Sequence, residues 1–177
     1  MIGEVLSGAA HPTASVFSRL ISDAHSDSIL RLNHYLPTCH PKIGFGEHTD
    51  PQILTLLRSN AVGGLQVSTE DGVWVPVSPY PDSAFCVNVG DVLQIMTNGR
   101  LRSVKHRAVV DSYGSRMSMA YFAAPPLDAK ISCISLGPNE PQKPPLYKSF
   151  TWAEYKKAAY NLRLGDSRLN LFKNGAS

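Results

Sequence analysis

Residues 84–110, AFCVNVGDVLQIMTNGRLRSVKHRAVV, decide the fold class of this chain. Three short apolar runs, 84–89, 92–96 and 106–110, are rich in β-branched residues, and segments such as Asn98-Gly99 separate them. Runs of about four to eight such residues between turn signals predict strands, and Asn-Gly between two runs predicts a hairpin turn. The stretch therefore predicts consecutive short strands.

The same pattern extends to both sides of this stretch. Further runs cover 29–35, 53–57, 65–67, 73–77 and 117–122, separated by Gly63-Gly64, Asp71-Gly72, Pro79-Tyr80-Pro81-Asp82 and Tyr113-Gly114. About eight short strands at roughly ten-residue spacing favour a sandwich or a barrel over a βαβ fold. We predict a mainly β protein with a double-stranded β-helix, or jelly roll.

Helical patterns precede and follow the β region. Val16, Phe17, Leu20 and Ile21 share a helix face behind a candidate N-cap at Thr13 or Ser15. Ser149 or Thr151 with Glu154 resembles a capping box before the apolar positions Trp152, Tyr155, Ala159 and Leu162. Residues 125–149 are Pro-rich and predict a surface loop. We therefore expect a short N-terminal segment with a helix (1–28), a jelly-roll core (29–127), and a Pro-rich loop with a C-terminal helix that packs on the core (128–177).

The composition excludes several classes of protein. The 177 residues are 43% hydrophobic and 18% charged, which suits a globular protein with a sizeable core. A net charge of +3 from scattered Lys and Arg argues against nucleic acid as the partner. No apolar run is long enough to cross a bilayer, and the N-terminus lacks the pattern of a secretory signal. Three cysteines (Cys39, Cys86, Cys133) are too few and too far apart for a disulfide framework. We expect a cytoplasmic protein that binds neither nucleic acid nor membrane, and the sequence sets no oligomeric state.

His48, Asp50 and His106 are the candidate metal ligands. Residues at i and i+2 of an extended segment project to the same face, so His48 and Asp50 can offer an imidazole and a carboxylate to one ion. His106 opens a later β-type run and can supply the third ligand. Two histidines and one carboxylate are the ligands of non-haem Fe(II) sites that keep open coordination positions. The triad therefore predicts an iron site suited to oxygen activation.

Arg116 and Ser118 follow the same i, i+2 rule and share a face of the 117–122 run. A guanidinium binds a carboxylate through two parallel hydrogen bonds, and a neighbouring hydroxyl can add a third. Asn33 and Tyr35 repeat the spacing on the 29–35 run. Three strands that each turn a polar pair inward predict a ligand pocket.

Each of these patterns has a simpler interpretation. An isolated His-x-Asp is a weak motif, Arg116 could form a solvated ion pair with Asp111, and Asn33 and Tyr35 could face solvent on an edge strand. The order of all three pairs along β-type runs favours the functional interpretation. The other histidines have no partner at ligand spacing, and the cysteines are expected to be buried or inert; the residues concerned are His11, His25, His34, His40, Cys39, Cys86 and Cys133.

With these residues in place, the chain resembles the plant 2-oxoglutarate- and iron(II)-dependent dioxygenases, and within them the gibberellin 2-oxidases. The resemblance rests on LRLNHY (30–35), IGFGEHTDPQILTLLRSN (43–60), GGLQV (63–67), FCVNVGDVLQIMTNGRLRSVKHR (85–107), RMSMAYFAAPPL (116–127) and FTWAEYKKAAYNLRLGDSRLNLF (150–172). GEHTDPQ and TNGRLRSVKHR are much more specific than His-x-Asp. The resemblance covers nearly the whole chain from Ile29 onward.

The resemblance implies a role for each candidate residue. His48, Asp50 and His106 match the family's iron ligands, and Arg116 and Ser118 match the pair that binds the distal carboxylate of 2-oxoglutarate. Tyr35 and Asn33 match the upstream co-substrate contacts. It further implies 2β-hydroxylation of gibberellins, of the C19 class, which inactivates the hormone, with Fe(II), 2-oxoglutarate, dioxygen and ascorbate as reductant.

Three hypotheses follow for this chain. The first is a gibberellin 2-β-dioxygenase, or a relative that acts on another plant metabolite. The second is a truncated, catalytically weak or dead fragment that still binds metal or 2-oxoglutarate. The third is a jelly-roll binding module whose His and Asp are incidental. Members of the family carry a longer region before the strand that begins here at Ile29, so we expect an incomplete substrate enclosure and an exposed apolar flank.

Overall fold

The computed structural model describes residues 15–79, 84–110, 112–134 and 144–175. Its strands are β1 (Ile29–Tyr35), β2 (Lys42–His48), β3 (Leu54–Ser59), β4 (Leu65–Ser68), β5 (Trp74–Pro76), β6 (Cys86–Val89), β7 (His106–Val110), β8 (Arg116–Ala123), β9 (Lys130–Ile131) and β10 (Phe150–Thr151). Its helices are α2 (Val16–Ser22), α3 (Asp91–Met96), α4 (Trp152–Asn161) and the 3-10 helix η2 (Arg168–Phe172). Among these residues, no helix is both long and apolar enough to cross a membrane.

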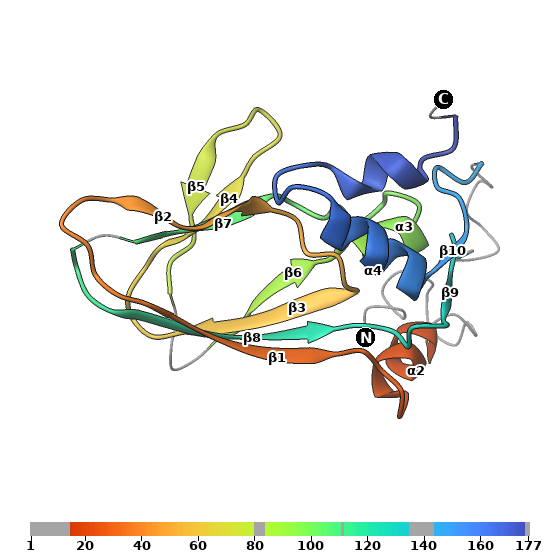
Figure 1. The fold of residues 1–177 in the computed structure, drawn as a ribbon, viewed down its shortest axis with the longest axis horizontal. Helices are drawn as coiled ribbons and strands as arrows, with labels where there is room; N and C mark the ends of the chain where they lie inside the picture. The colour runs from red at the N-terminus through yellow and green to blue at the C-terminus, as the bar shows by residue number, and fades with distance from the viewer. Residues whose placement is uncertain (1–14, 80–83, 111, 135–143, 176–177) are drawn as a thin grey trace.

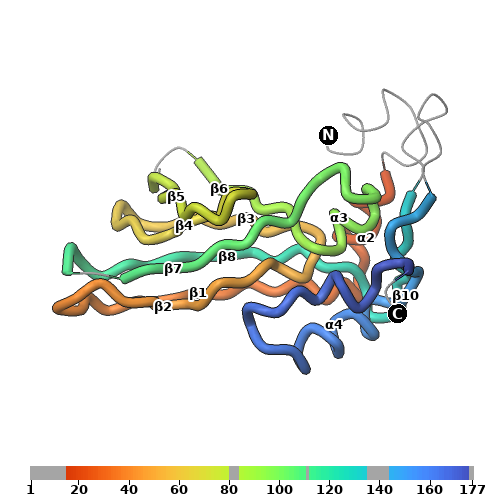
Figure 2. Tube along the Cα trace, turned by 90° about the horizontal axis from the view of Figure 1, so that it is seen from above, coloured from red at the N-terminus to blue at the C-terminus, as the bar shows by residue number. Residues whose placement is uncertain are grey.

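Two four-stranded antiparallel sheets form the body of the fold. One has the order β1-β8-β3-β6, the other the order β2-β7-β4-β5, and β9 pairs with β10 beside them. Figure 1 shows the two large sheets facing each other, with α3, α4 and α2 gathered at one end. The tube in Figure 2 places β3, β4, β5 and β6 along one side, and β1 and β2 along the other. The predicted jelly roll is confirmed.

The prediction for 92–96 is wrong, because this run is the helix α3 and not a strand. Its apolar side chains are buried almost completely: Val92, Leu93, Ile95 and Met96. A short, continuously apolar run carries no periodicity that separates a strand from a buried helix. Asn98 and Gly99 therefore follow the C-terminal end of α3, and the predicted hairpin turn is not formed. Asn98 has φ 50° and Gly99 φ 80°, and the Gly99 amide donates to the carbonyl of Gln94 at 2.8 Å.

Strand β2 is not among the predicted strands; the spacing of His48 and Asp50 predicted only that these two residues lie on an extended segment. The strand contains Gly44 and Gly46, which weaken a β pattern, and its pairing with β7 shifts register between Ile43 and Phe45 and again before His48. A Cβ at Gly44 would lie 2.9 Å from side-chain atoms of Tyr35 and Val110. The glycine therefore lets the two sheets approach each other near the site.

The C-terminal helix α4 forms as predicted. Thr151 is the N-cap, and Thr151 and Glu154 make a full capping box. Trp152 and Tyr155 are fully buried, and the indole Nε1 of Trp152 donates to Asp27 Oδ2 at 2.8 Å. Together with α3 these side chains make a core at one end of the barrel.

The prediction of a surface loop at 125–149 is wrong for several of its residues. Pro125 and Ile131 are fully buried, and Tyr147 is buried. Pro138 and Pro141 lie outside the described residues. At the other end of the chain, Ser15 takes the N-cap position of α2, whereas Thr13 lies outside the described residues.

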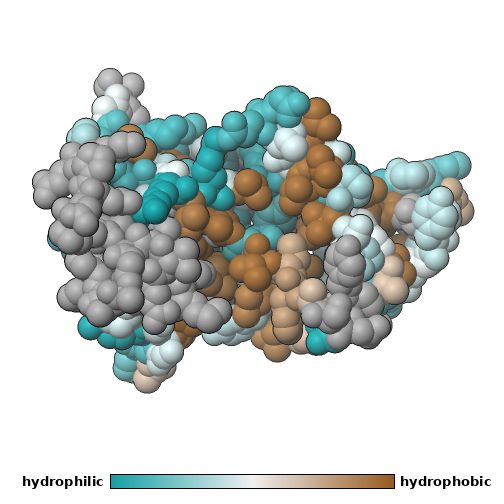
Figure 3. Space-filling model, turned by 180° about the vertical axis from the view of Figure 1, so that it is seen from behind, coloured by the Kyte–Doolittle hydropathy of each residue, from teal (hydrophilic) through white to brown (hydrophobic). Residues whose placement is uncertain are grey.

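Apolar side chains remain exposed on the outside of the β1-β8-β3-β6 sheet. On the edge strand β1, Leu30 and Leu32 are 59% and 74% exposed, and the exposed Met119 of β8 is the pairing partner of Leu32. Phe85 and Val87 are also exposed, and Figure 3 shows apolar side chains gathered in the middle of the face on the side of β3 and β6. The expected apolar flank is therefore present.

Candidate functional site

His48, Asp50 and His106 come together between the two sheets. His48 ends β2, His106 begins β7, and the two residues are direct partners in the antiparallel pairing. One ligand atom from each of the three residues lies within 4.8 Å of the others. Asp50 Oδ1 is 3.6 Å from His48 Nε2 and 3.4 Å from His106 Nε2. The three residues therefore point one nitrogen or oxygen each at a common point.

Hydrogen bonds behind the triad fix which atoms face that point. His48 Nδ1 lies 2.8 Å from the carbonyl of Gly46, and His106 Nδ1 lies 3.3 Å from the carbonyl of Val104. A carbonyl only accepts, so each Nδ1 carries the proton and each neutral ring presents the Nε2 lone pair. Thr55 donates to Asp50 Oδ2 at 2.6 Å, which leaves Oδ1 free to bind an ion.

The charges of the triad are strongly coupled. Burial, with the nearby charge of His106, lowers the pKa of His48 to about 4. Burial acts to raise the pKa of Asp50, but the hydrogen bond and charge of His106 outweigh it, so this pKa lies below its ordinary value. Burial acts to lower the pKa of His106, but Asp50 outweighs it and the pKa is raised. Asp50 and His106 therefore each favour the charged form of the other, whereas burial favours the neutral form of His48.

Arg116 is the charged group at the other end of the site. It begins β8, is only 3% exposed, and its Nε and Nη1 have no hydrogen-bond partner among the described residues. Its guanidinium carbon lies 5.8 Å from the centre of the Tyr35 ring, and Tyr35 is its partner across the β1–β8 pairing. A solvated ion pair does not describe so buried a side chain, and Asp111 lies outside the described residues.

Ser118 and Asn33 complete the polar lining. Both face inward from paired positions of β8 and β1, and Asn33 Nδ2 donates to Ser118 Oγ at 3.4 Å. All seven residues singled out from the sequence line one cavity of about 50 Å³: Asn33, Tyr35, His48, Asp50, His106, Arg116 and Ser118. Of the remaining histidines, His25, His34 and His40 are exposed and His11 lies outside the described residues.

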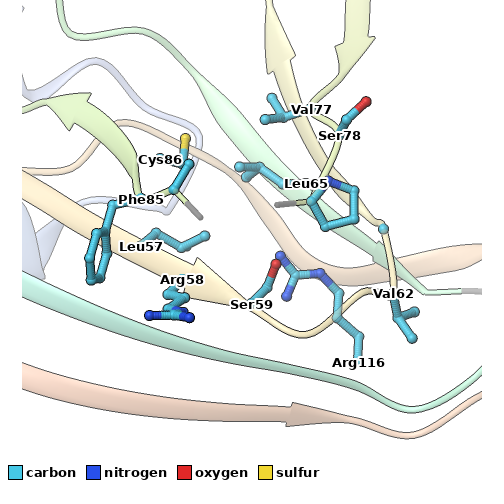
Figure 4. A pocket seen from close by; sticks show the side chains of 13 residues that line it. Leu57, Arg58, Ser59, Val62, Leu65, Val77, Ser78, Phe85, Cys86 and Arg116 are labelled. Atoms are coloured by element: carbon cyan, nitrogen blue, oxygen red, sulfur yellow. The ribbon is translucent and has the colours of Figure 1, made fainter. Parts of the chain in front are cut away.

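Two larger apolar cavities adjoin this polar centre. One, of about 350 Å³, touches His48 and Asp50 and is walled by α4 and the segment after it. The other, of about 310 Å³, reaches Arg116 between β3, β4 and β6, and Figure 4 shows the Arg116 guanidinium beside Ser59 with Leu57 and Leu65 nearby. The site is thus a polar centre between two apolar compartments.

Three residues of the site escaped the sequence reasoning. Asn88 lines the polar cavity with a buried Nδ2 that has no partner among the described residues, and it falls inside the 84–89 run that predicted a strand. Thr55, which holds Asp50, lay within a strand prediction without any polar pattern of its own. Asp91 is fully buried behind the triad, although Gly-Asp after a strand reads as a turn.

The cysteines are free thiols. Cys39 is exposed rather than buried, which leaves inertness as the expectation for this thiol, whereas Cys86 and Cys133 are partly buried and burial raises the pKa of each thiol. None of the three belongs to the metal cluster, which consists of His and Asp alone.

The donor set fits a divalent metal and a dicarboxylate. Two neutral imidazoles and one carboxylate on one side of an ion leave open positions opposite them, which is the ligand set of non-haem Fe(II) oxygenases. The buried guanidinium nitrogens of Arg116 lack partners among the described residues, and a carboxylate would supply them. The residues therefore suit an iron ion together with a carboxylate co-substrate.

Comparisons with known proteins agree with this chemistry. The chain is 58% identical to Gibberellin 2-beta-dioxygenase 4 of Arabidopsis thaliana, over 92% of this chain and 55% of the relative. It is 52% identical to Gibberellin 2-beta-dioxygenase 2 of the same plant, over 88% and 47%. Among solved structures, JOX2 in complex with 2OG, Fe and JA is 29% identical with a TM-score of 0.78, over 98% of this chain and 52% of that one.

The chain spans about half the length of the curated relatives that it matches. The chain nevertheless contains both large sheets and the seven residues of the polar cavity that the sequence singled out. Residues 26–125 match the model of the 2OG-Fe(II) oxygenase superfamily, which is more than half of the sequence. The chain belongs to the 2OG-Fe(II) oxygenase superfamily.

Proposed function

We propose that this chain carries out, or contributes the catalytic centre for, the 2β-hydroxylation of gibberellins with Fe(II) and 2-oxoglutarate. The observation that carries the proposal is the single polar cavity, in which a buried His-Asp-His cluster faces a buried, unsatisfied arginine. The identity to gibberellin 2-β-dioxygenases, higher than that to JOX2, supports gibberellin as the substrate class. We propose C19 gibberellins as the substrates, as the resemblance of the quoted sequence strings implies.

Each residue has a defined task in this proposal. His48, Asp50 and His106 hold the iron, and their hydrogen bonds to Gly46, Thr55 and Val104 keep the ligand atoms aimed at it. Bound Fe(II) and 2-oxoglutarate supply the chemistry that places one atom of dioxygen into a substrate C–H bond while 2-oxoglutarate loses carbon dioxide and becomes succinate.

The co-substrate is held at its far end by the β1–β8 pair. Arg116 and Ser118 bind the distal carboxylate of 2-oxoglutarate, with Tyr35 and Asn33 beside them. Because Arg116 is almost completely buried, its charge acts in a medium of low polarity and selects an anion strongly.

The 350 Å³ cavity next to His48 and Asp50 is the place for the gibberellin. Its walls include Phe45, Phe122 and Leu164, with Arg31 and Arg168 among its lining residues. An apolar compartment with a few cationic groups suits a rigid, hydrophobic carboxylic acid.

Turnover tests the proposal directly. Purified protein is incubated with a C19 gibberellin, Fe(II), 2-oxoglutarate and ascorbate, and the 2β-hydroxylated product and succinate are both quantified. We expect equal amounts of the two, and their loss in His48→Ala but not in His25→Ala, which changes an exposed histidine outside the cluster. Product formation that survives His48→Ala would refute the iron assignment.

We keep a second function as an alternative that is consistent with the exposed apolar flank. In that case the chain binds metal and 2-oxoglutarate but turns over no gibberellin. Anaerobic Fe(II) and 2-oxoglutarate would then give the visible charge-transfer band of the complex, without product in the aerobic assay. A different hydroxylated plant metabolite would instead identify a relative with another substrate.

We propose that the protein is cytoplasmic, because free thiols such as Cys39 persist in that compartment.

A further inference from the structure

Residues 48–50, here called the ligand segment, are held from outside by three hydrogen bonds. Thr49, the residue between the two metal ligands, donates through Oγ1 to Asp91 Oδ2 at 3.1 Å. Its carbonyl accepts from Nη1 of Arg168 at 2.8 Å. The amide of Asp91 donates to the carbonyl of Asp50 at 2.8 Å. The Thr49 hydroxyl and the carbonyls of Thr49 and Asp50 are therefore held by Asp91 and Arg168, neither of which belongs to the metal cluster.

Asp91 is itself anchored to the C-terminal helix. It is 0% exposed, and the same Oδ2 atom accepts a hydrogen bond from the Tyr155 hydroxyl of α4 at 2.8 Å. Tyr155 is also 0% exposed, and burial together with the charge of Asp91 raises its pKa, so the hydroxyl stays a donor. Thr49 and Tyr155 thus donate to the same carboxylate oxygen, and Asp91 Oδ2 connects α4 to the ligand segment.

The backbone packing around Asp91 leaves little room for movement. A Cβ at Gly90 would lie 1.9 Å from the carbonyl oxygen of Gln52. The amides of Gly90 and Val92 donate to the carbonyls of Ile53 and Gln52 at 2.9 and 3.2 Å. The start of α3 therefore packs directly against the chain that follows Asp50, so a shift of Asp91 would move the ligand segment with it.

Arg168 makes the contact from the other side. It lies in η2, is buried, and also lines the 350 Å³ cavity next to the metal ligands. Tyr155 and Arg168 both lie beyond residues 26–125, the part that matches the superfamily. These hydrogen bonds to the ligand segment therefore come from residues of α3 and of the C-terminal segment, and not from residues of β2 or β7.

We propose that Asp91, Tyr155 and Arg168, together called the clamp, are positioning residues. They hold the ligand segment in its metal-binding geometry, so that the C-terminal segment sets the metal affinity of the site. This inference rests on the proposed function only for the identity of the metal site. Side chains that orient ligands from behind change metal affinity by about 10- to 100-fold when they are removed. The clamp predicts an effect of that size from residues that never contact the ion.

The test compares two tyrosines of the same core. Tyr155→Phe removes only the hydroxyl that binds Asp91. Tyr147→Phe is the matched control, since Tyr147 is buried in the same cluster but its hydroxyl accepts from Gln94 at 2.8 Å and does not contact the clamp. Co(II), followed by its visible absorption, measures metal affinity without turnover, and chemical unfolding of the metal-free proteins measures stability in parallel.

We expect Tyr155→Phe to weaken Co(II) binding about tenfold, while Tyr147→Phe stays within about twofold of the parent at a similar loss of stability. Thr49→Val, which deletes the other hydrogen bond to the same oxygen, should weaken binding as well, and Thr49→Ser should restore it. These two variants carry the test if Tyr155→Phe does not fold.

The outcomes separate the clamp from the metal site. Equal Co(II) affinity in the parent, Tyr155→Phe and Thr49→Val would overturn the clamp while leaving the metal site intact. An equal loss in Tyr155→Phe and Tyr147→Phe would also overturn it, because the effect would then follow core stability. If the parent binds no Co(II), the metal assignment is wrong and the clamp falls with it.

Discussion

Arg116→Met should separate the stability of the fold from its co-substrate affinity. The guanidinium of Arg116 is 3% exposed, and its Nε and Nη1 have no partner among the described residues. Burial lowers the pKa of Arg116, which means that the folded protein disfavours its charge. Methionine fills a similar length of the cavity without a charge or donors, so the metal-free fold should gain stability while the co-substrate loses its anchor.

The structure sets the size of both effects. Replacing buried charged groups by apolar side chains of similar volume is neutral or stabilising by about 1–4 kcal/mol. Arg116 still borders a cavity, so we expect the lower end, about 1 kcal/mol, or roughly 2–4 °C in Tm for a chain of this size. A hydrogen bond to a charged group contributes about 1.5–3 kcal/mol, so loss of a two-bond fork should weaken 2-oxoglutarate binding at least about 100-fold.

Thermal unfolding of the metal-free protein and calorimetric titration of 2-oxoglutarate into the Co(II) form measure the two quantities. Arg19→Met serves as the control, because Arg19 is exposed on α2 and the substitution is the same. Destabilisation of Arg116→Met by more than about 1 kcal/mol would show that the arginine supports the fold. Unchanged 2-oxoglutarate affinity would refute its role in binding the distal carboxylate.

Three further predictions follow from the described contacts. Because the His106 pKa is raised and that of His48 lies at about 4, protons compete with the metal mainly at His106; the number of protons released on metal binding should rise as the pH falls, and affinity should fall by up to about tenfold per unit below the His106 pKa, as calorimetry in buffers of different ionisation enthalpy would show. Thr151→Ala removes the cap of α4 and should cost about 1 kcal/mol in urea unfolding, whereas a change below about 0.3 kcal/mol would argue that the cap is dispensable. A bulky maleimide should label Cys39 in the native protein well before Cys86, as mass spectrometry of brief reactions would show, and the reverse order would contradict the exposure of the two thiols.

The sequence predicted the site better than it predicted the local structure around it. The i, i+2 spacing of His48/Asp50, Arg116/Ser118 and Asn33/Tyr35 requires only that each pair lie on extended chain, and the period of a strand then puts both members on one face. Errors in the predicted ends of the strands do not affect that condition. The structure accordingly brings all six, with His106, to one cavity.

Features that depend on contacts far apart in the sequence could not be predicted in this way. The helix α3 is buried on all sides, so its residues show no alternation that would separate it from a strand. Asp91 gains its meaning only from Thr49 and Tyr155, which lie 42 and 64 residues away. The burial of Ile131 likewise depends on its pairing with Phe150, inside a stretch whose prolines predict a loop.

The described contacts divide the chemistry of this chain into two parts with different requirements. The ligands and Arg116 are held by pairings within each sheet, and by Asp91 and α4, all among the described residues. Metal and 2-oxoglutarate affinity should therefore report on contacts that this chain supplies. The substrate compartment has a wall from α4 and the segment after it, while apolar residues such as Leu32 and Phe85 remain exposed outside the sheet. Retention of gibberellin against water depends on enclosure as well as on the metal. The ratio of hydroxylated product to succinate therefore measures that enclosure, whereas the affinities for Co(II) and 2-oxoglutarate measure the centre alone.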